Sequence, residues 1–235
     1  LEDLMDIVVS SFLNDFKNRH DFETEKESKL FEHFVNYCII IRENPENFNY
    51  NEVSVDGSND MGIDGIAMLV NDHLICAESD IDHFKKQLKR FDVKFYFIQS
   101  KLSRHFKSSE IGSFMNGVRN FFTKDISKLN DIANDKIKRL LSFKDYIYKQ
   151  SIDMDEAPIC RLVYCCTGNW EDDANCNDRI KNGIDDLKSN DLFSDVEFIP
   201  YDLKKIKNVY KEINLKVTKE IEFDKHTIIP SSDNI

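Results

Sequence analysis

The sequence predicts a mixed α/β (α+β) fold in which a mixed β-sheet is flanked by helices on both sides. Glycine (7) and proline (4) are scarce among the 235 residues, which is typical of long helices and short loops. Segments with apolar residues at spacings of three and four alternate with short runs that are apolar or rich in aromatic and β-branched residues. Such alternation along one chain is typical of a sheet covered by helices.

Helices and strands are expected in a definite order. The apolar periodicity predicts helices over residues 1–19 and 25–42, followed by a polar, turn-rich segment at 44–61. Apolar or aromatic runs predict strands over 62–70, 73–77 and 94–101, with a helix over 80–90 before the last of them. The second half is expected to hold helices over 111–122 and 128–150, a strand over 160–167, a helix over 174–189, a strand over 196–200 and a helix over 203–213.

The charge of the chain is acidic and unevenly distributed. The formal net charge at pH 7 is −11, which argues against a protein that coats nucleic acid without sequence preference. Residues 1–80 hold 5 Lys and Arg against 18 Asp and Glu, whereas residues 101–124 hold five basic residues and one acid. The sequence therefore predicts a locally basic surface on an acidic protein.

Neither a membrane protein nor a secreted disulfide protein is indicated. No apolar run approaches the roughly 20 residues needed to cross a bilayer, and the N-terminus is acidic and amphipathic, unlike a signal peptide. The six cysteines form no C-x-x-C pair, and we expect buried thiols instead of ligands of a structural zinc ion. A reducing, cytoplasmic location fits this pattern.

Four polar residues stand where burial is expected: Glu32, Asp64, Gln99 and Lys101. Asp64 begins an apolar run, and Glu32 borders the apolar stripe of its helix. Gln99 and Lys101 end an aromatic strand with both side chains on one face, and Ser100 between them is expected to point away. Such charges are costly to bury unless they meet a partner charge, a metal or a phosphate. Because carboxylate and amide oxygens bind hard divalent cations, their convergence predicts a metal site.

This constellation resembles the PD-(D/E)xK phosphodiesterase superfamily, which has a restriction-endonuclease-like core. Asp64 matches the invariant acid and Glu32 the acid of the first helix. The segment Gln99-Ser100-Lys101 matches the (E/Q)-x-K element in the form seen in Mrr-type restriction endonucleases. More narrowly, three segments resemble the N-terminal region of the AIPR (abortive phage infection) family: Gly57-x-x-Asp60-x-Gly62-Ile63-Asp64-Gly65, Phe97-Ile98-Gln99-Ser100-Lys101 and Phe114-x-x-Gly117-Val118-x-x-Phe121-Phe122. The span between the Asp64 and Gln99 strands is longer than in a minimal core.

The resemblance implies a metal-dependent nuclease, an endonuclease that hydrolyses phosphodiester bonds of nucleic acid in anti-phage (antiviral) abortive infection defence, with DNA favoured over RNA. The implied cofactor is Mg²⁺, for which Mn²⁺ can substitute, held by Asp64, Gln99, Ser100 and Glu32. Lys101 would orient the attacking water or neutralise charge in the transition state.

Residues near and beyond these strands complete the implied site. Asp60 is either a supporting acid or a turn residue. Four residues are candidate phosphate contacts that position nucleic acid without reading its sequence: Ser103, Arg104, Lys107 and Arg119.

The domain organisation that we expect has three parts. Residues 1–24 form an N-terminal helix, residues 25–215 the nuclease-like domain with its core motifs at 25–125, and residues 216–235 a tail or linker. Because the chain starts with Leu and ends in a linker-like segment, a further domain of the same chain is expected to be missing.

The other partners that we expect are nucleic acid and a second copy of the chain in a homodimer. No membrane partner is expected. The alternative function is a catalytically degenerate nuclease-fold module that binds nucleic acid or protein, because Gln replaces Glu and the first third is strongly acidic.

Overall fold

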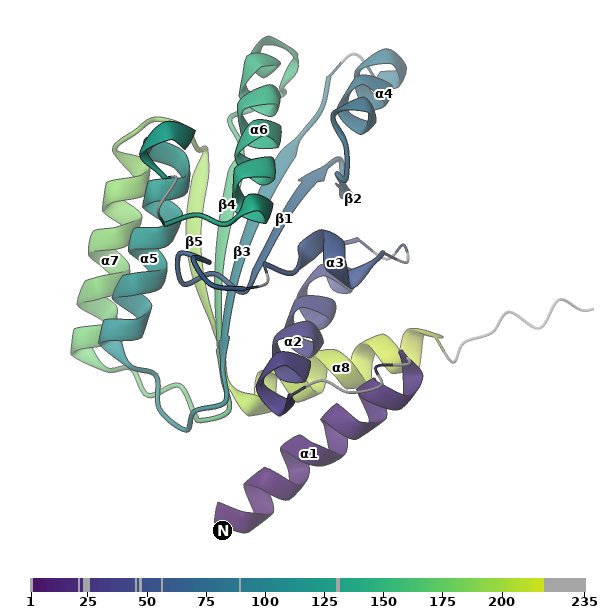
Figure 1. Cartoon of the computed structure of the whole chain (residues 1–235), viewed down its shortest axis with the longest axis vertical. Coiled ribbons are helices and arrows are strands. Elements are labelled where there is room, and N and C mark those ends of the chain that lie inside the picture. The colour runs from purple at the N-terminus through teal and green to yellow at the C-terminus, as the bar shows by residue number, and fades with distance from the viewer. Residues whose placement is uncertain are drawn as a thin grey trace, which may run out of the picture.

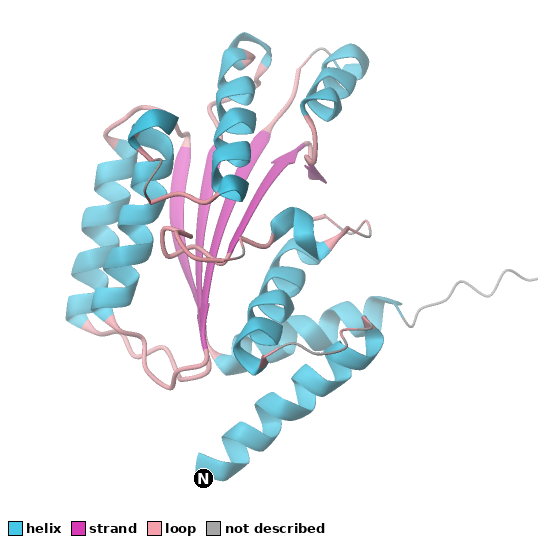
Figure 2. Cartoon of the chain, in the orientation of Figure 1, coloured by secondary structure: helices cyan, strands magenta, loops and turns pink. Residues whose placement is uncertain are grey.

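A five-stranded mixed sheet lies at the centre of the molecule. The computed structural model describes residues 2–20, 22, 26–44, 46, 48–55, 57–88, 90–129 and 132–217. The sheet order is β2-β1-β3-β4-β5, with strands β1 (Gly65–Val70), β2 (His73–Leu74), β3 (Val93–Lys101), β4 (Ile159–Cys166) and β5 (Asp195–Tyr201). Strands β2, β1 and β3 are antiparallel neighbours, whereas β3, β4 and β5 run parallel (Figure 2).

Helices cover both faces of this sheet. On one side lie α1 (Glu2–Arg19), α2 (Glu27–Glu43) and α8 (Leu203–Val217), and on the other α5 (Ser108–Thr123), α6 (Asp135–Lys149) and α7 (Ala174–Lys188), with α4 (Glu78–Leu88) beside α6 (Figure 1). Alternation along β3 separates the two cores, because Phe95 and Phe97 belong to one buried cluster and Tyr96 and Ile98 to the other. The predicted fold class, a mixed sheet flanked by helices, is confirmed.

Most predicted elements are present with shifted ends, and four differences have a local cause. The strand predicted from residue 62 begins at Gly65, because Asn59, Met61 and Gly62 have φ values of 60°, 58° and 72° and form turns. The strand predicted over 73–77 has two residues, since the Asp80 carboxylate accepts the amide protons of residues 76 and 77 at the start of α4.

The other two differences concern helices. The helix predicted from residue 128 begins at Asp135, because the Asn134 side chain caps it by accepting from Ile137 N at 3.0 Å. A short helix α3 (Tyr50–Val53) interrupts the predicted loop at 44–61, and the Asn49 side chain caps it. Residue 25, the predicted start of the second helix, and residues 218–235 of the predicted tail lie outside the described residues.

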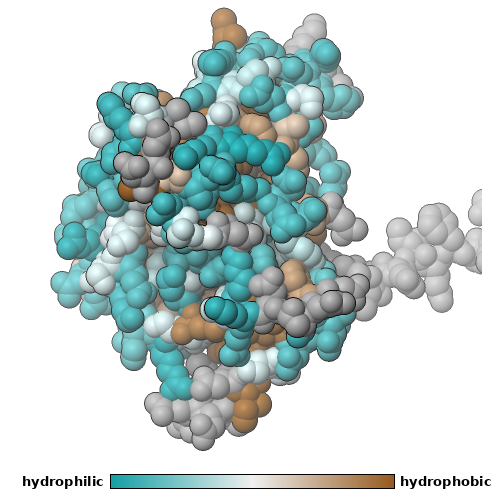
Figure 3. Space-filling view, viewed as in Figure 1, coloured by the Kyte–Doolittle hydropathy of each residue, from teal (hydrophilic) through white to brown (hydrophobic). Residues whose placement is uncertain are grey.

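The surface is mostly polar. Figure 3 shows a face that is largely hydrophilic with small apolar patches. Within the described residues, no helix is long and apolar enough to span a bilayer. Five cysteines are buried, as predicted, while Cys76 is partly exposed, and all six are free thiols.

Candidate active site

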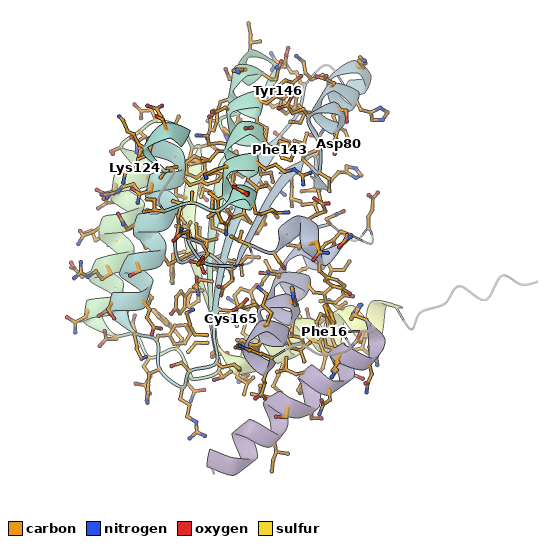
Figure 4. All side chains as sticks on the ribbon, viewed as in Figure 1. Phe16, Asp80, Lys124, Phe143, Tyr146 and Cys165 are labelled. Atoms are coloured by element: carbon orange, nitrogen blue, oxygen red, sulfur yellow. The ribbon has the colours of Figure 1, made fainter. Side chains whose placement is uncertain are left out.

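The candidate site lies where β1 begins and β3 ends. Because these strands are antiparallel, Gly65 pairs with Ile98, and Asp64 N donates to Ile98 O at 2.9 Å. Asp64 is therefore held opposite the last residues of β3. Cys165 of β4 is the strand partner of Ser100. The Cys165 label in Figure 4 therefore shows where along the strands the site lies.

The Asp64 carboxylate accepts three hydrogen bonds on one oxygen. Its Oδ2 accepts from Ser100 N at 2.7 Å, Gln99 Nε2 at 2.9 Å and Ser100 Oγ at 3.0 Å. The prediction that the Ser100 side chain points away was therefore wrong. Asp64 lies just before the strand, and its side chain reaches across to both Ser100 groups. All three residues are buried, with 2–5% of each exposed.

Electrostatics link Glu32 and Lys101 to the same carboxylate. Burial raises the pKa of Asp64 to about 6, and the negative charge of Glu32 acts in the same direction. The ammonium group of Lys101 and the Ser100 hydrogen bonds oppose this rise. Glu32 also forms an ion pair with Lys29 at 2.7 Å. The structure thus brings together the four residues that the sequence singled out, with Ser100.

A glycine on α5 allows close packing against the loop that carries Asp64. Asp60 Oδ1 accepts from Gly62 N at 2.7 Å, so Asp60 serves as a turn residue here. A Cβ atom at Gly117 would lie 2.0 Å from the carbonyl oxygen of Met61. Only glycine permits this approach, so Gly117 lets α5 pack directly against the loop that carries Asp64.

A buried polar network, not expected from the sequence, supports Asp64 through its backbone carbonyl. Asn36 Nδ2 donates to Asp64 O at 3.2 Å and to Ser54 Oγ at 3.4 Å, and His33 Nδ1 lies 3.0 Å from Ser54 Oγ. Asn36 follows Glu32 by four residues, which places both on one face of α2. An amide one helical turn after Glu32, on the same face of α2, is the sequence signal that could have identified it.

A third acid flanks the site, from α5. Glu110 accepts from Tyr164 OH at 3.1 Å and pairs with Lys107 at 3.0 Å. Tyr164 is the partner of Gln99 in the β3–β4 register. Its pKa is raised mainly by burial and also by the charges of Glu110 and Asp64. No sequence pattern near Glu110 indicated this role, because the contact depends on the position of α5 over the sheet.

The predicted phosphate contacts fall into two places. Ser103, Arg104 and Lys107 belong to the segment after β3, where Ser103 O accepts from Thr167 Oγ1 at 2.9 Å and Gly168 N at 3.1 Å. Arg119 lies farther along α5, about 16 Å from its first residue, and contacts Asn116 and Asp186 at 2.6 and 3.4 Å. The structure does not bring Arg119 together with the other three.

The donor set fits a hard cation if the Gln99 amide contributes its oxygen. In the described part of the chain, no group of three or more His, Cys, Asp or Glu side chains lies close enough to hold a metal. Gln99 Oε1, however, is buried and has no hydrogen-bond partner there. A half-turn of the amide exchanges this oxygen with Nε2, now 2.9 Å from Asp64 Oδ2. Neighbouring oxygen ligands of octahedral Mg²⁺ lie about 3.0 Å apart.

Comparisons with known proteins do not assign a family. No family model, no curated protein and no solved structure matches the chain.

Proposed function

We propose that this chain is a metal-dependent phosphodiesterase, an endonuclease domain acting on nucleic acid, with DNA favoured over RNA. The observation that carries the proposal is the convergence of Gln99, Ser100 and the charges of Glu32 and Lys101 on the buried Asp64 carboxylate. Sequence resemblance to the PD-(D/E)xK superfamily supports it. A role in abortive infection defence, a further domain and a homodimer belong to the same proposal.

The residues that would hold Mg²⁺ or Mn²⁺ are Asp64, Gln99, Ser100 and Glu32. When bound, such an ion supplies Lewis acidity to a phosphoryl oxygen and lowers the pKa of a water. Asp64 and the Gln99 amide oxygen would bind it directly, because the amide oxygen is buried without a partner. The Glu32 side chain is 22% exposed. Its carboxylate is therefore accessible to water, while its charge also acts on Asp64.

Lys101 acts on the phosphate in this proposal. Its side chain is partly exposed at the end of β3, and no ion pair joins it to another part of the described chain. An ammonium group held near the Asp64 carboxylate can orient a water molecule or offset charge that builds on the phosphoryl oxygens. The adjacent segment with Ser103, Arg104 and Lys107 would position the nucleic-acid backbone.

The direct test is cleavage of single- and double-stranded DNA and RNA with Mg²⁺ or Mn²⁺. Lys101→Ala should abolish cleavage while leaving the free energy of unfolding within about 1–2 kcal/mol of the parent chain. Lys149→Ala, an exposed lysine at the end of α6, is the matched control and should cleave normally. Full cleavage by Lys101→Ala would contradict the proposal.

A catalytically degenerate module that binds nucleic acid or protein is the second candidate. It is favoured by the three protein donors on Asp64 Oδ2, which satisfy this oxygen without a cation. Thermal unfolding with Mn²⁺ separates the two candidates, because a ligand that binds only the folded chain raises its melting temperature. An unchanged melting temperature in Mn²⁺ together with no cleavage would favour the degenerate module.

A further inference from the structure

A second site lies on the same sheet, away from the candidate active site. A pocket of about 330 Å³ opens on the α2 and α8 side, between the last turn of α2, the first turn of α8 and strands β3, β4 and β5. Its β5 residue Tyr201 pairs with Cys165, which pairs with Ser100, so Tyr201 lies two strands, or about 10 Å, from the Asp64 site. Arg42 lies ten residues, or about 15 Å, along α2 from Glu32. The pocket therefore shares no lining residue with the Asp64 site.

The walls of this pocket carry more positive than negative charge. Its cations are Arg42, Lys94, Arg161 and Lys205, and its acids are Glu43 and Glu197. Two of the cations are neutralised by close acids. Lys94 pairs with Asp72 at 2.6 Å, and Arg161 pairs with Asp195 at 2.6 Å and Glu197 at 3.3 Å.

The other two cations meet at Tyr201. Arg42 Nη1 donates to Tyr201 OH at 3.3 Å, and Lys205 Nζ lies 4.1 Å from the centre of the Tyr201 ring. Neither cation forms an ion pair within the described residues. Burial and the like charge of Arg42 lower the pKa of Lys205. The acids Asp202 and Glu197 oppose this shift with smaller effects.

Lys205 lies in the first turn of α8, whose N-terminus is capped by Asp202. Asp202 Oδ1 accepts from Lys205 N at 2.7 Å, and Lys205 Nζ donates to Pro200 O at 3.2 Å. The two cations thus face one end of the pocket. Tyr201 OH accepts from Arg42, which leaves its own proton available for an incoming oxygen.

We propose that this pocket binds the phosphate group of a small phosphomonoester, held between Arg42, Lys205 and Tyr201. A dianion removes the repulsion between the two cations, and guanidinium matches phosphate geometry. About 330 Å³ lies at the small end of ligand pockets, which suits a molecule the size of a nucleoside monophosphate. Glu43 and Glu197 also line the pocket, and their charges disfavour a polyanion there.

Calorimetry of the whole chain in EDTA tests the site without involving a metal. The probes are inorganic phosphate, adenosine 5′-monophosphate and adenosine. We expect both phosphates to bind and adenosine not to bind. Adenosine 5′-monophosphate should bind more tightly than inorganic phosphate if an organic phosphomonoester is the ligand. The reverse order would overturn the organic ligand, and no binding of either phosphate at about 10 mM would overturn the site.

Substitutions at the pocket mouth locate the binding. Lys205→Met and Arg42→Gln should each weaken phosphate binding by about tenfold or more, because each removes a charge-assisted contact. Lys204→Met, the neighbouring exposed lysine, should bind as the parent chain does. Equal losses in Lys204→Met and Lys205→Met would overturn the assignment.

One more variant separates this proposal from the nuclease proposal. Asp64→Asn should bind phosphate as tightly as the parent chain, because the two sites are separate. Loss of phosphate binding in Asp64→Asn would place the phosphate in the active site instead. Unchanged melting temperatures of Lys205→Met and Arg42→Gln would show that their losses reflect binding and not folding.

Discussion

Gly117 offers the sharpest test of how the fold holds Asp64. A Cβ atom at this position would lie 2.0 Å from Met61 O, three residues before Asp64 in the chain. Carbon and oxygen atoms normally stay about 3.3 Å apart or more. In Gly117→Ala, α5 or the loop must therefore move by about 1 Å, and the obstacle is backbone that cannot rotate away.

Two opposing effects set the size of the change in stability. Alanine is favoured over glycine in a helix interior by about 1 kcal/mol. Overpacking costs about 1–3 kcal/mol, and occasionally more. Because the displaced group is backbone, we expect the upper end of that cost. The free energy of unfolding of Gly117→Ala should then fall by about 1–2 kcal/mol.

The same helix contains a matched control. A Cβ atom at Gly112 would meet only the flexible Arg179 side chain, at 3.6 Å. Gly112→Ala should therefore stabilise the chain by up to about 1 kcal/mol through helix propensity. Two identical substitutions in one helix are thus expected to act in opposite directions.

Urea unfolding followed by far-ultraviolet circular dichroism measures both variants. In a chain of this size, each 1 kcal/mol also shifts the melting temperature by about 2–4 °C. Equal stabilisation by the two substitutions would refute the reasoning, because it would mean that the Met61 carbonyl does not press on α5. A destabilised Gly117→Ala with weaker Mn²⁺ binding would further connect this contact to the Asp64 loop.

Three further predictions concern Asp64 and its support. The pKa of Asp64 is raised from 3.8 to about 6, so the stability gained from its protonated form is complete below pH 3.8 and is lost as the pH rises through about 6. In EDTA, the free energy of unfolding of the parent chain should fall by about 3 kcal/mol relative to that of Asp64→Asn between about pH 4 and 6.5. If urea titrations gave the same difference between the two chains at every pH, that result would contradict a buried carboxyl. Because a metal competes with this proton, Mn²⁺ should raise the melting temperature more at about pH 7.5 than at about pH 5.5; an equal shift in Asp64→Asn would place the metal elsewhere. Asn36→Ala should lower the free energy of unfolding by about 1 kcal/mol, since it removes the hydrogen bond to Asp64 O, and a parent-like urea midpoint would show that this bond contributes nothing.

Local patterns sufficed for most of the fold. Apolar spacing identified α2 and α5, and the aromatic run identified β3, because these periodicities follow from backbone geometry alone. The predicted boundaries were wrong where one side chain accepts hydrogen bonds from nearby backbone amides, as Asn134 does at the start of α6 and Asp80 does after β2. Such caps depend on local hydrogen bonds that periodicity does not report.

The sequence by itself determined which residues of the candidate site stand out: Asp64, Gln99, Lys101 and Glu32 are polar groups at positions where apolar neighbours predict burial. Only the tertiary structure decided that Ser100 turns its hydroxyl to Asp64, that Glu110 reaches Tyr164, and that Arg42 and Lys205 meet at one tyrosine. These contacts join residues far apart in the chain or on separate elements. Their geometry follows from strand register and from how helices pack across the sheet, and neither is encoded in local spacing.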